Sequence, residues 1–401
     1  MGTEATTVID LRDHGTDDDA RVRALEDLGV LDHGAEERLD RVTRLAQHVF
    51  GVASASVNLI DKDRQHIRSI HGRPLLDGPR ADAICDLTIR GADTLVISDL
   101  TTDARVAANP LVTGDPHLRF YAGHPLEAPG GHRVGTLCLT DDQPRQFGPK
   151  EQALLRELAG WVQHELTRSA ELDQAAEVQR RLLPRRSPII PGYEVAGVCV
   201  PSRGVGGDFL DWYCAAGDEV SITVGDVMGK GIAAAIIMAT VRAAMRSTAS
   251  CPGPTEAVGS AAATLQQDLE ETGTLVTLCH ARLSPDTGLL RYTDAGHGLM
   301  LLVRADGSVR RPHGGGLPLG IFTSEQWVEG RVHLGPGDVV LAFSDGLLDL
   351  YDGTLAALDP LVAAVAQCAS AQQVVDRFAA LTRRAGPLDD DVTVVAIRRS
   401  A

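Results

Sequence analysis

The stretch Glu219-Val-Ser-Ile-Thr-Val-Gly-Asp226-Val-Met-Gly-Lys-Gly231 decides how the second half of the chain folds. Its first eight residues form an apolar run that is typical of a buried strand. The glycines that follow permit a tight turn, and the apolar run at residues 232–247 is typical of a helix. The stretch therefore predicts a strand, a turn and a helix, with Asp226 at the end of the strand.

Three further motifs place an aspartate beside an apolar strand. They are Val205-Gly-Gly-Asp208, Ser344-Asp345-Gly346 and Asp389-Asp390-Asp391-Val-Thr393. A single Asp-Gly pair after a strand is usually a turn, because Asp bonds to local backbone and Gly accepts a positive φ. Four such motifs beside four core strands of one domain instead predict that the strand ends bring these carboxylates together.

Converging carboxylates repel one another in a partly dry cleft, and divalent cations relieve that repulsion. Oxygen ligands without His or Cys favour Mg²⁺ or Mn²⁺ over zinc. Two such ions can lower the pKa of a shared water and direct it at a phosphorus atom. The residues therefore indicate metal-assisted hydrolysis of a phosphoester, while calcium storage or a structural metal site stays open.

The rest of the second half is rich in strands. Strand-like runs occupy residues 193–200, 275–283, 289–294, 300–303, 339–344 and 392–397, and helical patterns occupy residues 255–270 and 371–382. Strands with long helices between them predict a layered β-sandwich that carries helices on its outer faces.

The first half predicts an α+β domain of about 150 residues, which is an ordinary domain size. Its strands are expected at residues 53–61, 65–70, 94–98, 119–126 and 133–139, and Pro149 begins a helix over residues 151–166.

The helix is expected to continue to Leu183 as a connector, since only Gly160 interrupts it. Its heptad seam contains the polar residues Glu165, Ser169 and Gln179, so a strong coiled coil is disfavoured, although a weak or switchable one that allows a homodimer stays open. We favour a linker helix that lies on its own domains. The prolines at 184, 188 and 191 then mark a boundary.

Composition narrows the classes of partner. The chain has 54 acidic and 38 basic side chains, a formal charge of −16, which argues against a nucleic-acid surface. No apolar run approaches the ~18 residues of a membrane span, and the acidic N-terminus lacks the pattern of a signal peptide. A cytoplasmic protein without nucleic-acid or membrane partners is expected.

Seven scattered cysteines include no C-x-x-C pair, which argues against a zinc site or a disulfide scaffold. Most of them are expected to be small buried hydrophobic residues.

The second half resembles the PPM metal-dependent serine/threonine protein phosphatases, in their stage II sporulation protein E-like branch, over about residues 175–398. The four aspartate motifs carry this resemblance. Further matching motifs are Val178-Gln-Arg-Arg-Leu-Leu-Pro184, Asp294-Ala-Gly-His297 and Leu317-Pro-Leu-Gly320.

This resemblance implies a β-sandwich flanked by helices around two Mn²⁺ or Mg²⁺ ions. It implies that Asp226 bridges the ions and that the carbonyl of Val227 completes one shell. Asp345 and Asp390 match ligands of the other ion, and Asp208 would hold the second metal directly or through water. These residues are the expected catalytic and metal-binding set.

Other residues near the motifs carry weaker expectations. Met228 stands where many relatives place a His, so protonation of the leaving oxygen must come from water or another group. Arg203 could hold phosphate with its planar fork, although an exposed loop arginine is an equal reading. Lys230 could also meet phosphate or simply precede the helix. His297 is expected to be structural, and Asp211 is not expected to be a ligand.

The first half resembles a GAF sensor domain over about residues 21–166. The matching motifs are Gly29-Val-Leu-Asp32, Arg119-Phe-Tyr-Ala-Gly-His-Pro-Leu126 and Gly135-Thr-Leu-Cys-Leu139. The resemblance implies a central antiparallel sheet with helices and an unknown small-molecule ligand. Cys85, Cys138 and two histidines, His66 and His124, have no diagnostic spacing for haem or bilin and are expected to be core residues.

We therefore expect a flexible tail at residues 1–18, a GAF domain at 19–166, a helical linker at 167–186 and a PPM-type phosphatase domain at 187–401. The resemblance implies hydrolysis of phosphoserine or phosphothreonine on a bacterial regulatory protein, for instance an anti-sigma factor antagonist, under control of the GAF domain. The alternatives are a non-catalytic pseudophosphatase scaffold and a phosphatase of small molecules.

Overall fold

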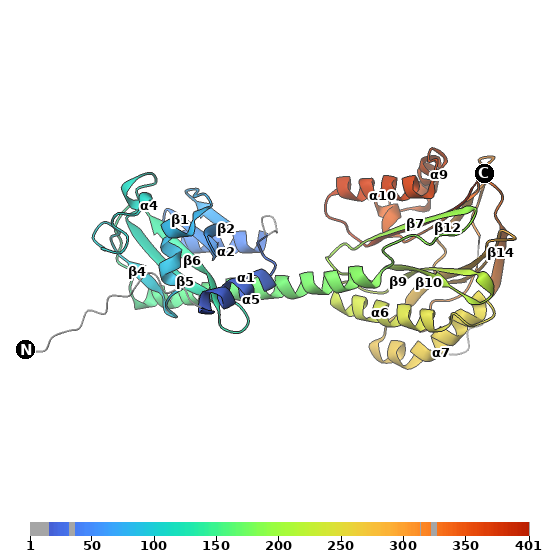
Figure 1. Ribbon diagram of the computed structural model, residues 1–401, viewed down its shortest axis with the longest axis horizontal. Coiled ribbons are helices and arrows are strands. Elements are labelled where there is room, and N and C mark those ends of the chain that lie inside the picture. The colour runs from blue at the N-terminus through green and yellow to red at the C-terminus, as the bar shows by residue number, and fades with distance from the viewer. Residues whose placement is uncertain (1–15, 32–36, 313, 322–326, 401) are drawn as a thin grey trace, which may run out of the picture. The chain divides into compact units, whose positions relative to one another are not determined.

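The computed structural model describes residues 16–31, 37–312, 314–321 and 327–400. The chain divides into two compact units, Met1–Asp173 and Gln174–Ala401 (Figure 1). Most of the predicted tail lies outside the described residues, and helix α1 (Thr16–Asp27) begins within its last three residues. Among the described residues, no helix combines the length and the apolar character that crossing a membrane requires.

The N-terminal unit is built on a six-stranded antiparallel sheet with the order β3-β2-β1-β6-β5-β4. Its strands are β1 (Ser54–Ile60), β2 (Arg64–Gly72), β3 (Gly78–Pro79), β4 (Leu95–Ile97), β5 (Phe120–Glu127) and β6 (Arg133–Asp141). The five strands expected from the sequence are all present, and β3 adds a short edge pairing to β2.

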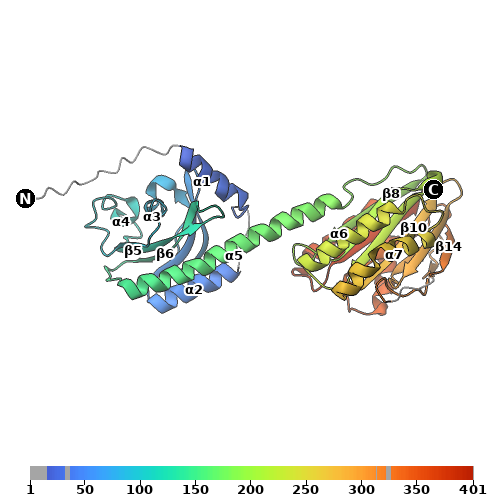
Figure 2. The ribbon, with the colours of Figure 1, turned by 90° about the horizontal axis from the view of Figure 1, so that it is seen from below.

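Alternate residues of these strands face two different helical layers. Val57 and Leu137 pack into a core with α1, α2 (Glu37–Phe50) and the first half of α5 (Pro149–Leu182). Tyr121 and Cys138 face the opposite layer, which contains η1 (Arg80–Asp82), α3 (Ile84–Thr88) and α4 (Pro110–Thr113). Figure 2 shows α2 and α5 on one side of the sheet and α3 and α4 on the other.

The C-terminal unit contains two five-stranded sheets with the orders β14-β11-β10-β9-β8 and β13-β12-β15-β16-β7. The first sheet comprises β8 (Phe209–Cys214), β9 (Val220–Val227), β10 (Val276–Ser284), β11 (Leu289–Ala295) and β14 (Glu329–His333). The second comprises β7 (Tyr193–Val200), β12 (Met300–Val303), β13 (Val309–Arg310), β15 (Val339–Phe343) and β16 (Val392–Arg399).

The two sheets pack face to face, and helices cover both outer faces (Figure 1). Helices α6 (Ile232–Ser247) and α7 (Pro254–Thr272) pack on the first sheet. The second sheet carries α8 (Gly346–Asp349), α9 (Leu358–Ala366) and α10 (Ala371–Ala385), and the short η2 (Ala216–Asp218) and η3 (Leu355–Ala357) lie in connections. The expected fold class, α+β with a β-sandwich flanked by helices, is confirmed.

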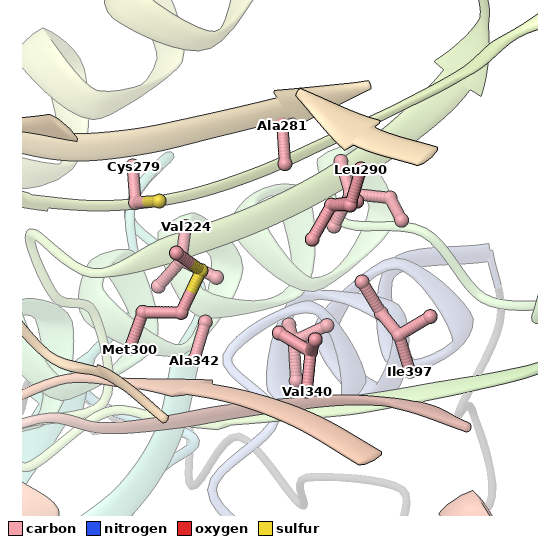
Figure 3. A pocket seen from close by; sticks show the side chains of 10 residues that line it. Val224, Cys279, Ala281, Leu290, Met300, Val340, Ala342 and Ile397 are labelled. Atoms are coloured by element: carbon pink, nitrogen blue, oxygen red, sulfur yellow. The ribbon is translucent and has the colours of Figure 1, made fainter. Parts of the chain in front are cut away.

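The interior between the sheets is almost completely filled. Side chains from both sheets, Cys279 and Ala281 facing Met300 and Val340, leave a cavity of about 10 Å³ (Figure 3). An apolar void of this size is at the lower limit for one water molecule, so the sandwich core is a packed support and not a ligand pocket.

The sequence pattern predicts neither β8 nor β14. Strand β8 contains the buried Asp211, which interrupts the apolar run that marks the other core strands. Strand β14 is an edge strand whose residues are mostly polar and partly exposed. The predicted connector is largely helical, because α5 continues to Leu182.

Candidate metal centre

Four strand ends meet at one edge of the sandwich. Strand β8 begins directly after Asp208, and β9 contains Asp226 as its next-to-last residue, with Phe209 paired to Gly225. In the other sheet, β15 ends two residues before Asp345 and β16 begins two residues after Asp390. Because both pairs of strands are antiparallel neighbours, each sheet brings two aspartates to this edge.

Asp391 ties the two sheets together at this edge. Its Oδ1 accepts hydrogen bonds from the backbone N–H and the hydroxyl of Ser202, at 2.8 and 2.9 Å. Its Oδ2 accepts one from the N–H of Gly207 at 2.8 Å. The side chain is only 4% exposed. Asp391 therefore fixes the loop that carries Asp208, whereas its neighbour Asp389 is exposed.

Two glycines allow the backbone segments of this edge to approach closely. A Cβ atom on Gly207 would lie 2.4 Å from the carbonyl oxygen of Val227, and one on Gly346 would lie 2.2 Å from that of Asp391. No side chain fits at either distance. The glycines of the Val-Gly-Gly-Asp and Ser-Asp-Gly motifs thus permit the packing that brings the aspartates near one another.

Asp208 is the most buried of the four predicted ligands, with 2% of its surface exposed. Its Oδ2 atom accepts no hydrogen bond from any residue that the structure describes. Burial, and then the charge of Asp226, raise the pKa of Asp208 well above its usual value. A buried carboxylate oxygen without a donor is a costly group, and a cation would satisfy it.

The negative charges of the neighbouring carboxylates act on Asp226. Burial raises its pKa to about 6, and the charges of Asp345, Asp390 and Asp391 add to this effect. The repulsion shows that carboxylates from both sheets act on one another. Such a donor set, oxygen only and strongly negative, suits Mg²⁺ or Mn²⁺.

Lys230 supplies a positive charge at the same edge. Its Nζ lies 3.0 Å from Oδ2 of Asp390 and donates a hydrogen bond to the carbonyl of Asp389. The exposed Arg203 is a second cation, whose charge opposes the effect of Asp390 on the pKa of Lys230. These two basic residues therefore border the acidic edge.

Within the described ranges, no three His, Cys, Asp or Glu side chains stand in the arrangement of a formed metal centre. The assignments of Asp208, Asp226, Val227, Asp345 and Asp390 as ligands thus stay predictions. The orphan oxygen of Asp208 and the mutual repulsion around Asp226 fit divalent ions at this edge.

Gln179 on α5 also holds the loop that carries Asp208. Its Nε2 donates to the carbonyl of Gly206 at 2.7 Å, and its Oε1 accepts from the N–H of the same residue at 3.0 Å. The side chain is buried. Sequence reasoning places Gln179 in the heptad seam as a polar residue and in the motif Val178–Pro184, and neither pattern names Gly206 as its partner.

The remaining candidate residues are Asp211, His297 and Met228. Asp211 lies 2.6 Å from Arg246 and 3.2 Å from Arg242, both on α6, so it anchors that helix. His297 is buried, and its backbone N–H donates to Oδ1 of Asp294 at 2.7 Å, so its expected structural role stays a prediction. Met228 is exposed.

Two family models match the chain. The model described as stage II sporulation protein E (SpoIIE) matches residues 216–400, and the GAF domain model matches residues 34–166. Asp226, Asp345 and Asp390 fall inside the first match, whereas Gln179, Arg203 and Asp208 precede it.

Similar proteins match parts of the chain. A cyclic di-GMP phosphodiesterase of Pseudomonas aeruginosa is 33% identical over 170 residues, which are 41% of this chain but only 29% of that protein. The phosphoserine phosphatase RsbU of Bacillus subtilis is 26% identical over 245 residues, 59% of this chain and 72% of RsbU. The solved RsbU and RsbW domains of a Mycobacterium tuberculosis protein are 29% identical over 54% of this chain and 62% of that one, with a TM-score of 0.47.

The fold of each unit, the aspartates at the sandwich edge and the two family matches agree. The chain carries a domain of the GAF family at residues 34–166, followed by a domain of the stage II sporulation protein E family at residues 216–400.

Proposed function

We propose that this chain is a metal-dependent phosphatase that hydrolyses phosphoserine or phosphothreonine on a regulatory protein. The observation that carries the proposal is the acidic edge, where burial and the charges of Asp345 and Asp390 raise the pKa of Asp226. The match of residues 216–400 to the SpoIIE family model and the similarity to a phosphoserine phosphatase support this reaction class.

In this proposal, Asp226 would be a ligand of both of two Mn²⁺ or Mg²⁺ ions. The carbonyl of Val227 would help to hold one ion, Asp345 and Asp390 would hold the other, and Asp208 would contribute directly or through water. When bound, the ions neutralise the phosphate and lower the pKa of water near it.

Two basic side chains of the protein have a separate role in this proposal. Arg203 and Lys230 lie beside the carboxylates and can orient the phosphate oxygens from the solvent side. Met228 has no proton to give, so the leaving serine oxygen takes its proton from solvent or from another group.

The substrate in this proposal is a phosphoprotein, for instance an anti-sigma factor antagonist. The similarity to RsbU supports a protein-borne phosphoserine. A cytoplasmic location, a GAF ligand and the pairing of two copies through α5 stay predictions.

The GAF domain would regulate the reaction through α5. This helix begins at Pro149, beside the GAF sheet, and its residue Gln179 bonds to Gly206 in the loop that carries Asp208. A shift of α5 would therefore move that loop. Deletion of residues 1–165 is expected to change the rate of hydrolysis, and an unchanged rate on the native substrate would exclude this regulatory role.

The decisive experiment is a titration of the full chain with Mn²⁺ and with Mg²⁺ while phosphate release from a phosphoserine peptide is measured. Release should require metal, stop with a chelator and be lost in Asp345→Asn, whereas Asp389→Asn is the matched control. Turnover without metal would overturn the mechanism. Binding of the peptide without release under saturating metal would instead favour the pseudophosphatase scaffold.

A further inference from the structure

Two cysteines of the N-terminal unit lie side by side where α3 packs against the sheet. Cys85 is on α3 and Cys138 is on β6, and their Sγ atoms are 3.8 Å apart. Both are nearly inaccessible to solvent, with 3% and 2% of their surfaces exposed. The residues are 53 positions apart in sequence, so the fold and not local chain geometry places the two sulfurs in contact.

Polar donors surround the pair within an otherwise apolar layer. Nδ2 of Asn58 donates to both sulfurs at 3.1 Å, and the hydroxyl of Tyr121 donates to Cys85 at 3.6 Å. The Ser56 hydroxyl lies 3.2 Å from Cys138. Donors are unnecessary for cysteines that only fill space, whereas they stabilise the negative charge of a thiolate.

This environment makes the two sulfurs unequal. The hydrogen bond between the two sulfurs lowers the pKa of Cys85 to about 6 in spite of burial, and it raises the pKa of Cys138. Cys279, a buried cysteine of the C-terminal unit, has a pKa that burial raises. Cys85, which accepts hydrogen bonds from Asn58 and Tyr121 and lies on the short helix α3, is assigned as the nucleophile, and Cys138 as the thiol that resolves its product.

We propose that Cys85 and Cys138 form an oxidation site that a hydroperoxide converts into an intramolecular disulfide. The Cys85 thiolate attacks one oxygen of hydrogen peroxide, the O–O bond breaks, and the departing hydroxide takes a proton and leaves as water. Cys85 is then a sulfenic acid. The sulfur of Cys138 attacks the sulfur of Cys85, the S–O bond breaks, and the hydroxide leaves with the Cys138 proton as a second water.

In total, two thiols lose two electrons and two protons while one peroxide is reduced to two waters. The sulfurs must close from 3.8 Å to the ~2.0 Å of a disulfide. Helix α3 has only five residues, so a small shift of this segment brings Cys85 to the sheet. The product joins α3 covalently to β6, the strand that precedes α5 in the chain.

The test treats the folded full chain with hydrogen peroxide, blocks the remaining thiols and digests the protein without reductant. Mass spectrometry should find one peptide pair joined through Cys85 and Cys138, two hydrogens lighter and separated again by dithiothreitol. Cys279 and Cys368 are internal controls for burial alone. They are 4% and 9% exposed, close to the values for Cys85 and Cys138. They should stay reduced, because the proposed reaction depends on the contact between two sulfurs and not on burial.

Variants sharpen the assignment. In Cys138→Ser, Cys85 should accumulate as a sulfenic acid that dimedone traps, and in Cys85→Ser the Cys138 thiol should remain reduced. Cys214→Ser, at an exposed cysteine, should leave the disulfide unchanged. The proposal is overturned if both thiols stay free while the exposed Cys214 oxidises, or if Cys85 proceeds to sulfinic acid in the presence of Cys138.

Discussion

The acidic edge has two halves that are held in different ways: the loop that carries Asp208, and the positions of Asp345 and Asp390. Asp208 is buried, and its loop is fixed from both sides by Asp391 and Gln179. Asp345 and Asp390 lie in more accessible positions, and Asp390 is paired with a lysine. The fixed half, around Asp208, is therefore positioned by the fold. The adjustable half, at Asp345 and Asp390, is positioned by charge and can adjust when ions bind.

The largest effect is expected where both halves meet. Asp226→Asn removes the charge that the other carboxylates repel and the bridging ligand of the proposed centre. Phosphate release should fall by about a thousandfold, since a metal supplies several kcal/mol to such a reaction. Metal-dependent release from a phosphoserine peptide is the measurement, with Asp389→Asn as control. A variant as active as the wild type would remove Asp226 from the mechanism.

The fixed half depends on Asp391. Asp391→Ala leaves the buried N–H of Gly207 without its acceptor, and it also removes the acceptor of Ser202. The C-terminal unit should lose about 3 kcal/mol of unfolding free energy, because buried donors without partners are costly. Urea unfolding followed by tryptophan fluorescence measures this loss, in a Trp161→Phe background that leaves only Trp212 and Trp327 of the C-terminal unit.

The matched control for this loss is Asp389→Ala, two residues away and exposed. It should leave the unfolding midpoint within about 0.5 kcal/mol of the wild type. Equal midpoints for the two variants would show that Asp391 does not anchor the loop.

Gln179 is the second anchor of the fixed half. Gln179→Glu keeps the acceptor for the N–H of Gly206 but places an oxygen against its carbonyl, where Nε2 donated before. We expect a loss of about 2 kcal/mol from the C-terminal unit in the same urea assay. Arg180→Ala, at the next and exposed position, should change little. Identical curves for Gln179→Glu and wild type would contradict the contact.

The two halves also differ in how far the sequence predicts them. Each motif that sets an aspartate beside a strand is local, so the pattern places Asp226, Asp345 and Asp390 at the ends of predicted strands. Asp208 is predicted from its Val-Gly-Gly-Asp motif, although the strand that follows it, β8, is not predicted. The anchors could not, because Gln179 meets a residue 27 positions away and Asp391 one 184 positions away. Nothing local distinguishes Asp391 from the exposed Asp389; only burial in the tertiary fold does.

Protons should compete with metal ions for Asp226, where the fixed and adjustable halves meet. The pKa of Asp226 is raised from 3.8 to about 6, so the folded state binds this proton more tightly than the unfolded state. In metal-free protein, Asp226 therefore destabilises the fold as pH rises from 4 to 6, and this penalty is fully present above pH 6.

Metal binding must displace the same proton. Mn²⁺ affinity of the full chain, measured by calorimetry, should therefore fall by about tenfold or more for each pH unit below 6, because Asp208, whose pKa is also raised, must lose its proton too. Asp226→Asn should lose this part of the pH dependence. An affinity that is flat between pH 5 and 7 would contradict the raised pKa.

The smallest effect belongs to the adjustable half. Lys230→Gln removes a cation that lies 3.0 Å from Asp390 and repels an incoming metal ion. Mn²⁺ affinity should rise about threefold at low salt, because partly exposed charge pairs contribute up to about 1 kcal/mol, and the gain should shrink at high ionic strength. Lys150→Gln, at the start of α5, is the matched control. A fall in affinity would instead show that Lys230 holds Asp390 in place for the metal, so this half too would be set by the fold.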